Sequence, residues 1–569
     1  MKRKMAKKLL CIAAVGMMFP MAVQASEADL QLKIDKLSKE VNDLKGSVKK
    51  VEDKSLGKWL TIGGDYRFRV DGLKGKTVTY MDAPATFANA QSTMQSNFFN
   101  SAAGMMPDGT PVAAGVAGAA FWQANLGQMM TFSQKMSNVK TVNQANTFLG
   151  SNAGMITGLT GFAVKPPADK PKNATLYTNK FGLDLHAKAT QDVTVNVKLN
   201  MYKAFGSQND DATTGNYFSD RVGVFDGTQG HVPSDGLLNV DRAYATWSNI
   251  AEQPVWFSVG RRPATNGAPS NLKLNSERPG NGGTPALLVD YAFDGMTLGY
   301  APDIDALSGF YTKICYGRGF DSGFKDVSNS IKDTDMLGVA VIPVDTDPLR
   351  VWLQWNRGFN IFDFPVMSNS TFGNTAPSIN LGDIDWYGAG AMSTLKNIGP
   401  GSLNMFVDGG MSITHPNDNV SANAGFQGLG TGAFFKPETP SDKKGYAVFA
   451  GVRYDLPSKT KIGFEFNHGS KDWITFAPAA DDMWTSKVGV RGNVYEPYVI
   501  QELNLKPISS YVSKAFFKLG YQYYDFEYTG SNNWVGAPVK ISDIKSTDML
   551  LLAPVKEAHN VYATFEVKF

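Results

Sequence analysis

The sequence predicts an all-β transmembrane barrel of about sixteen antiparallel strands, preceded by a short α-helical coiled coil. Three patterns predict it: an N-terminal export signal, a heptad repeat of apolar residues, and then segments in which apolar and polar residues alternate. We therefore expect a signal peptide at residues 1–25, a periplasmic coiled-coil helix at 26–57 and an outer-membrane barrel at 58–569, which includes a long Met/Ala/Asn-rich first extracellular loop at 71–174.

The export signal has the usual three parts. Five basic residues precede an apolar core from Leu9 to Val23, and the small-residue site that ends at Ala25 predicts cleavage after that residue. The segment carries five cations and no acid, so its removal changes the formal charge from +3 to −2. This balance gives no reason to expect a nucleic-acid partner.

The heptad repeat lies in residues 27–54, where apolar residues follow alternating steps of four and three. Such spacing keeps one apolar seam on a partner helix and favours a coiled coil over a single amphipathic helix. The residue types at the seam leave dimer and trimer open. The predicted seam residues are Leu30, Ile34, Leu37, Val41, Leu44, Val48 and Val51.

After Lys58 the period of the pattern changes to two, as in Leu60–Val70 and Val193–Met201. Alternating side chains give a strand one apolar and one polar face, and about ten residues span a bilayer when the strand is tilted. The predicted strands are 59–70, 175–188, 193–203, 237–248, 255–262, 286–301, 308–319, 334–344, 349–359, 384–395, 402–414, 443–456, 461–468, 496–505, 511–528 and 558–569.

The connections between these strands are alternately short and long. Short periplasmic turns and long extracellular loops are typical of outer-membrane barrels, so we expect both termini in the periplasm. The last strand carries Phe565, Val567 and Phe569 on one face and resembles the C-terminal signal that barrels present to their assembly machinery. We therefore expect the barrel assembly machinery and outer-membrane lipid as partners.

If the apolar face of each strand points outward, many cations point into the lumen. A cationic wall in a low-dielectric tube attracts anions. The alternative, that acids of the loops balance these cations, stays equally open. The predicted lumen-lining cations are Arg67, Arg69, Lys180, Lys188, Lys198, Arg242, Arg262, Arg350, Arg453, Lys461, Lys514 and Lys518.

Two long connections are candidates for a role in the lumen. By analogy with general porins, the third connection would fold inward as a constriction loop with Lys273, Glu277 and Arg278; an ordinary surface loop is the alternative. The first connection is nearly free of charge between residues 83 and 164 and rich in methionine, which argues against a solvated tail. We expect it to plug the lumen, to cap the barrel or to bind a partner.

Motifs for chemistry are absent from the sequence. It has no Cys-x-x-Cys-His, no His-Glu-x-x-His and no Gly-x-Ser-x-Gly, and its histidines are dispersed. We therefore expect no enzymatic activity, no cofactor and no metal site.

Two resemblances bear on function. The heptad, the segment Asp241–Trp247 and the Gly-Arg-Arg-Pro sequence ending at Pro263 resemble trimeric porins with an N-terminal coiled coil, which often take small carboxylates or other anions. This resemblance favours a homo-trimer. Lys58–Arg69 and the chain as a whole also resemble a porin-like family of metal-reducing bacteria, in which some barrels sheathe multihaem cytochromes.

The resulting expectation is an outer-membrane porin for passive diffusion of small hydrophilic, anionic solutes. The alternative is a barrel scaffold that encloses a multihaem c-type cytochrome in an electron conduit across the outer membrane. A third hypothesis is a surface-display barrel or adhesin in which the first connection is the functional part.

Overall fold

The computed structural model describes residues 36–41, 59–103, 116–206, 238–262, 267–277, 287–289, 292–324, 330–370, 373–477, 482–505 and 513–569. The chain divides into two units, Met1–Thr61 and Ile62–Phe569. In the first unit, residues 36–41 are helical, and the seam residues Leu37 and Val41 are exposed. The other five predicted seam residues and the signal peptide lie outside the described residues.

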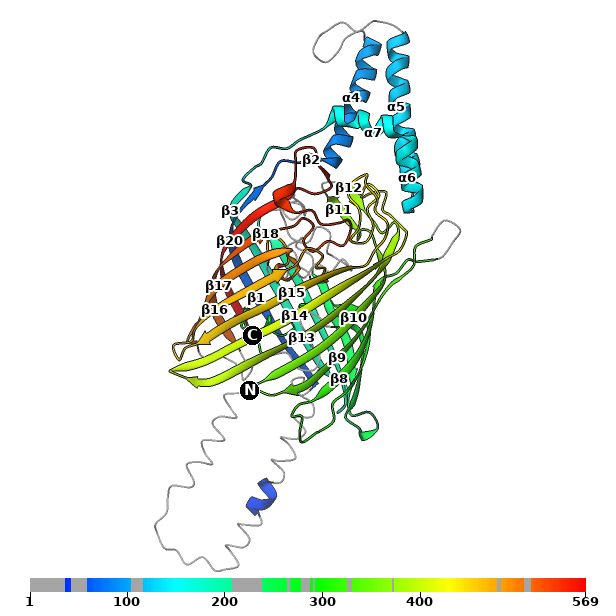
Figure 1. Ribbon diagram of the computed structural model, residues 1–569. Helices are drawn as coiled ribbons and strands as arrows, with labels where there is room; N and C mark the ends of the chain where they lie inside the picture. The colour runs from blue at the N-terminus through cyan, green and yellow to red at the C-terminus, as the bar shows by residue number, and fades with distance from the viewer. Residues whose placement is uncertain are drawn as a thin grey trace, which may run out of the picture. The chain divides into compact units, whose positions relative to one another are not determined.

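The second unit contains a closed antiparallel barrel of sixteen strands, as predicted (Figure 1). Each strand pairs with its neighbours along the chain, and the first and last strands close the ring with Asp65 opposite Lys568. The barrel strands are β1 (Leu60–Thr77), β3 (Lys172–Lys188), β4 (Val193–Ala204), β5 (Asn239–Trp247), β6 (Val255–Arg262), β7 (Phe293–Tyr300), β8 (Tyr311–Phe320), β9 (Thr334–Asp345), β10 (Arg350–Phe362), β13 (Asn380–Ile398), β14 (Gly401–Pro416), β15 (Lys443–Asp455), β16 (Thr460–Gly469), β17 (Gly492–Glu502), β18 (Lys514–Phe526) and β20 (Val555–Lys568).

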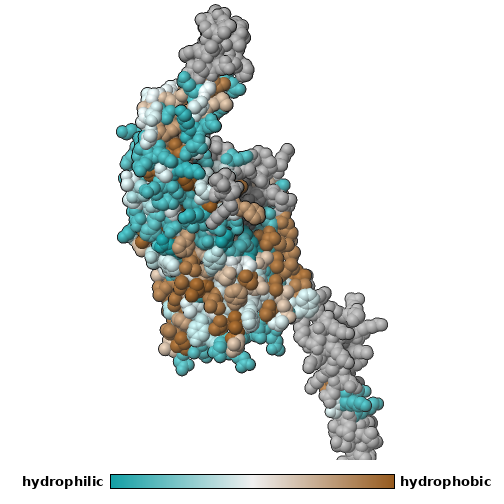
Figure 2. Space-filling model, turned by 90° about the vertical axis from the view of Figure 1, so that its right-hand side faces the viewer, coloured by the Kyte–Doolittle hydropathy of each residue, from teal (hydrophilic) through white to brown (hydrophobic). Residues whose placement is uncertain are grey.

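The period-two pattern of the sequence appears as alternating burial along each strand. In β9, Met336, Ala340 and Ile342 are buried inside the ring, whereas Leu337 and Val339 between them face outward. Hydrocarbon cannot pair a free backbone group, so a closed ring with an apolar outer face is the form in which strands cross a bilayer. Figure 2 shows that face as a band of hydrophobic side chains on the barrel, with hydrophilic side chains above it.

The connections alternate between short turns and long loops. The long ones hold two small sheets, β2 (Met81–Asp82) with β19 (Met549–Leu550) and β11 (Met367–Ser370) with β12 (Gly373–Thr375). The predicted strand 286–301 begins later than expected, at Phe293, because Leu287 and Leu288 before it are buried in the core of the barrel.

The first long connection is largely helical. It contains α4 (Ala83–Ala103), α5 (Val116–Ser137), α6 (Val142–Ser151) and α7 (Ala153–Leu159), with α4 and α5 side by side (Figure 1). This helical unit packs on the connection between β14 and β15: Val142 N–H donates to Asp418 O at 2.9 Å, and the Phe148 and Phe426 rings lie 5.4 Å apart. Among the described helices, none is both long and apolar enough to cross a membrane.

Candidate functional site: the barrel interior

The third long connection, between β6 and β7, contributes a buried turn to the barrel interior. Ala268–Asn275 forms this turn, and Lys273 at its centre is 6% exposed. Its ammonium group lies 2.8 Å from Glu496 of β17 and 3.4 Å from Asp482. A buried cation requires such carboxylates, because its desolvation is costly.

Cations of the barrel wall donate hydrogen bonds to the same turn. Arg453 of β15 donates to Leu272 O at 2.6 Å, and Lys568 of β20 donates to Leu274 O at 2.7 Å. Lys461 of β16 donates to the Asn275 side chain at 2.7 Å. The turn from β6–β7 is therefore seated on β15–β20, on strands far from it in the sequence.

The connection between β16 and β17 also enters the interior. Lys487 lies in this connection and binds both Glu465 and Glu496. Burial alone would lower the pKa of Lys487, but the carboxylates of Glu465, Glu496 and Asp482 outweigh it and hold that pKa well above its usual value. Lys273 and Lys487 thus share Glu496, which joins the two inward connections.

An apolar cluster fills the interior beside β10–β15. Three buried tryptophans fix it by donating indole N–H bonds to backbone carbonyls: Trp386 to Ile474 at 2.8 Å, Trp473 to Val488 at 2.7 Å and Trp534 to Phe362 at 2.6 Å. Buried indoles normally find such a partner. On this side the lumen is occupied by the protein's own connections.

On β1 and β3–β6 the cations stand among acids and aromatic rings. Lys198 contacts Asp65 at 2.7 Å and Asp184 at 2.9 Å. Arg67 and Lys180 lie over the Tyr202 ring, at 5.3 and 5.8 Å from its centre.

The remaining predicted cations have these placements. Six of them form ion pairs with acids: Arg69 with Asp71 at 2.7 Å, Arg242 with Asp241 at 3.2 Å, Arg350 with Asp345 at 3.8 Å, Arg453 with Asp455 at 2.7 Å, Lys461 with Glu502 at 2.7 Å and Lys518 with Glu566 at 3.0 Å. Lys514 lies 4.0 Å from Glu277, and Arg262 donates to the Ser258 hydroxyl at 3.1 Å. Lys188 is exposed at the end of β3. Of the predicted constriction residues, Lys273 is buried, Glu277 is exposed and Arg278 lies outside the described residues.

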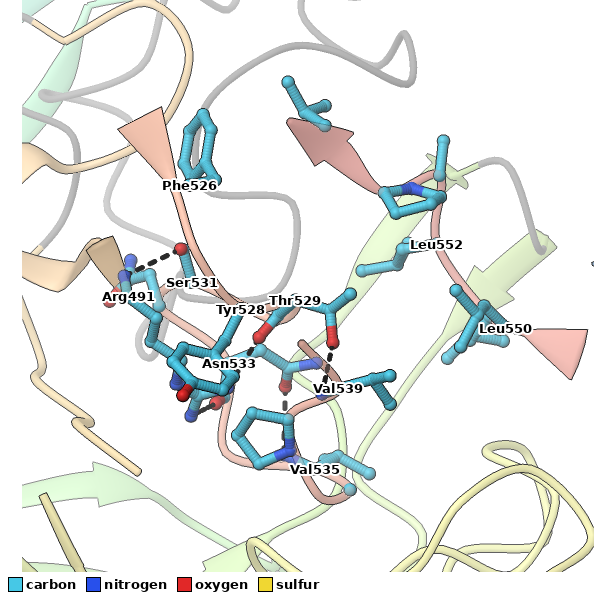
Figure 3. Close-up of a pocket in the computed structure, with 18 of the residues that line it drawn as sticks. Arg491, Phe526, Tyr528, Thr529, Ser531, Asn533, Val535, Val539, Leu550 and Leu552 are labelled. Atoms are coloured by element: carbon cyan, nitrogen blue, oxygen red, sulfur yellow. Dashed lines mark hydrogen bonds between the residues drawn. The ribbon is translucent and has the colours of Figure 1, made fainter. Parts of the chain in front are cut away.

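A cavity of about 160 Å³ lies among the loops around residues 526–555 (Figure 3). Arg491 is the charged residue of its described lining, and its guanidinium donates to Trp473 O, Thr529 O and Asn533 O at 3.0, 3.1 and 2.7 Å. Burial lowers the pKa of Arg491 to about 10. Since these carbonyls engage the guanidinium, Arg491 joins loops together.

Comparison with known proteins gives a family. A model of the family described as "Protein of unknown function (DUF3373)" matches residues 170–569. The chain belongs to this family. The matched residues of this DUF3373 protein begin just before β3 and therefore contain every barrel strand except β1. No curated protein matches the sequence.

Solved structures with some likeness are outer-membrane proteins. OmpT of Vibrio cholerae in its trimer form is 11% identical, with a TM-score of 0.34 and coverage of 90% of this chain and 100% of that chain. OprB of Pseudomonas putida is 11% identical, with a TM-score of 0.38 and coverage of 93% and 97%. An anion-selective porin from Comamonas acidovorans is 10% identical, with a TM-score of 0.35 and coverage of 90% and 99%. Scores this low carry no argument about function; the strand pairing of this DUF3373 protein itself establishes its barrel.

Several interior residues were not predicted from the sequence. Lys313 of β8 is 2% exposed and alternates with the outward Ile314, so it carries the same parity signal as the predicted cations. Glu496 and Asp408 are buried acids on the inward parity of β17 and β14. Lys487 lies in a connection without periodicity, and no sequence signal indicates its place.

Proposed function

We propose that this protein is an outer-membrane porin that lets small hydrophilic anions diffuse passively. The observation that carries the proposal is a closed barrel whose outer face is apolar and whose inner face bears cations on most strands. Apolar outer faces belong in lipid, and a charged inner face belongs beside water and solutes. Selectivity then comes from the inner charges rather than from any chemical step.

The two sides of the interior have different roles in this proposal. Lys273, Arg453 and Lys461 hold the third connection against β15–β20, so that this connection narrows the lumen. Solutes pass along β1 and β3–β6, where Arg67 and Lys180 offer positive charge beside the Tyr202 ring. The anion preference is mild, because acids such as Asp65 and Asp184 stand on the same wall.

Assembly and orientation follow from the same proposal. The termini and the coiled coil lie in the periplasm, the helical first connection lies outside the cell, and the coiled-coil seam holds a trimer. The interior contains the protein's own connections, which favours a path for small solutes over a sheath around a cytochrome.

Planar-bilayer recording of the purified mature protein tests the function. We expect stable conductance steps and, under a salt gradient, a reversal potential on the anion side. Lys180→Gln should move that potential toward cations, because it removes an inner positive charge. Lys396→Gln is the matched control, since Lys396 forms an exposed pair with Asp347 at a turn.

Folding is checked by the heat-modifiable migration that intact barrels show on gels. A folded, inserted barrel that gives no conductance steps would overturn the porin proposal. A cation-side reversal potential would overturn the anion preference.

A further inference from the structure

Three connections of the barrel meet around the cavity of about 160 Å³ that Figure 3 shows. They run from β14 to β15, from β16 to β17 and from β18 to β20. Lys273, Arg453 and Lys461, which fasten the third connection, are not part of its described lining. The cavity therefore lies apart from the solute path proposed above, which runs along β1 and β3–β6.

Hydrogen bonds between the connections keep this space open. Gly536 N–H donates to Gly428 O at 2.9 Å and joins the β18–β20 connection to the β14–β15 connection. Asn532 N–H donates to Gly489 O at 3.0 Å and joins the same connection to the one between β16 and β17. Because these bonds fix the three connections relative to one another, the cavity is preformed, and a ligand need not order the loops on binding.

The walls of the cavity are mainly apolar and partly aromatic. Trp484 and Phe526 are 7% and 8% exposed, and Tyr528 adds a third ring to the lining. Figure 3 shows Phe526 and Tyr528 on one side of the space and Leu550 and Leu552 on the other. Aromatic rings attract one another in stacked or edge-on geometries beyond the effect of burial alone, so these walls favour a flat aromatic ligand.

Hydroxyl groups stand among the apolar side chains of the lining. Thr529 Oγ1 accepts a hydrogen bond from Val539 N–H at 3.0 Å, and Ser531 Oγ accepts one from Arg491 N–H at 3.0 Å. Both oxygens thus act as acceptors toward the protein, and a hydroxyl can donate as well as accept. A ligand that carries one oxygen atom would find a donor here.

The charge of the lining argues against a charged ligand. No acidic side chain belongs to the described lining, and the guanidinium of Arg491 donates to three backbone carbonyls. Taking a charged group out of water is costly unless an opposite charge pairs with it. Because the guanidinium is already engaged by these carbonyls, the cavity suits an uncharged molecule.

The volume of the cavity indicates the size of this molecule. An engineered apolar cavity of about 150 Å³ stays free of water and binds benzene. The cavity of about 160 Å³ in this protein therefore has room for one six-membered ring with a small substituent.

We propose that this cavity binds a small uncharged molecule that has a single aromatic ring and one hydroxyl group, such as phenol. The ring packs on Phe526, Tyr528 and Leu552, and the hydroxyl forms hydrogen bonds with Thr529 or Ser531. This inference goes beyond the proposed function, because it assigns a binding site that does not require any solute to pass through the barrel.

Calorimetric titration of the detergent-purified mature protein with phenol tests the site. We expect saturable binding that Phe526→Leu weakens about fivefold, because this variant removes a ring from the wall. Tyr523→Leu is the matched control: Tyr523 lies on the same strand, stacks on Tyr495 with ring centres 6.2 Å apart and is not part of the described lining. This variant should bind phenol as the wild type does.

A further variant keeps the test decisive if Phe526→Leu fails to fold. Leu552 is half-buried and lies in a loop, so a larger side chain there leaves the ring of strands intact. Leu552→Trp fills the cavity without changing a charge and should abolish saturable binding. Heat-modifiable migration on gels checks that each variant is folded.

Each outcome decides one part of the inference. Saturable phenol binding that Leu552→Trp abolishes would support the site, whether or not the barrel conducts. Equal heats from wild type and Leu552→Trp would overturn the site, because phenol would then be dissolving in the detergent micelle. Cyclohexanol binding as tight as phenol binding would overturn the aromatic assignment, and benzoate binding as tight would overturn the preference for an uncharged molecule.

Discussion

Replacing Lys273 with methionine tests whether the ion pairs of the third connection hold it inside the barrel. The change keeps the length of the side chain and removes its charge, so Glu496 and Asp482 each lose a cation, at 2.8 and 3.4 Å. Breaking a buried ion pair by removing one partner costs about 3–5 kcal/mol. Glu496 keeps Lys487 at 2.5 Å and the Tyr562 hydroxyl at 2.8 Å, so we expect the lower end, about 3 kcal/mol.

If the third connection binds β15–β20 more weakly by about 3 kcal/mol, the fraction of molecules in which it is detached rises on the order of a hundredfold. We expect single-channel records of Lys273→Met to show a higher and noisier conductance than those of the wild type. The control is Lys396→Met, which breaks an exposed pair of little energetic weight.

Two readouts refute this reasoning. One is a folded Lys273→Met barrel whose conductance and noise equal those of the control. The other is a guanidinium-unfolding free energy that the substitution leaves unchanged, since a buried pair of this kind cannot be lost without cost.

Glu438, in the connection between β14 and β15, has a pKa below its usual value. Burial alone would raise this pKa, but the N–H of Gly432 donates to the carboxylate at 3.1 Å and helps to lower it. Glu438 therefore stabilises its loop at neutral pH and loses this effect as the pH falls through that lowered pKa, so hydrogen exchange in the loop should accelerate in acid, and Glu438→Gln should remove the pH dependence. Deleting Phe569, whose backbone exchanges hydrogen bonds of 2.8 and 3.0 Å with Gly64, should lower the heat-modifiable fraction in outer membranes. Placing aspartate at both Leu37 and Val41 should abolish chemically cross-linked trimers while the barrel still migrates as a folded species.

The sequence predicts the barrel well because the signal belongs to each strand separately. A strand with one face in lipid and one toward the interior must alternate apolar and polar residues, whichever strands it pairs with. The prediction fails where a strand extends beyond the lipid. β1 continues to Thr77 rather than residue 70, and its burial still alternates there, but the residues that face outward include Lys76 instead of apolar side chains. Outside the lipid the outer face no longer needs to be apolar.

The interior was predictable only in part. Parity indicates which residues point inward, but it does not indicate their partners: Lys273 and Glu496 are 223 residues apart in sequence. Lys313 carries the parity signal but lies between Tyr311 and Cys315, whose weak polarity obscures it. The helices α4 and α5 carry no clear apolar stripe, so the sequence indicates that the first connection is ordered without indicating its form.

The third connection leaves the barrel wall between β6 and β7 and is fastened to β15–β20. A ring of strands alone can be flattened into an oval by lateral pressure, since hydrogen bonds between neighbours fix the circumference but not the cross-section. A segment anchored at two separated points of the ring acts as a cross-member that resists this deformation. A variant that breaks the buried ion pairs of Lys273 should then make the wall of the barrel easier to deform.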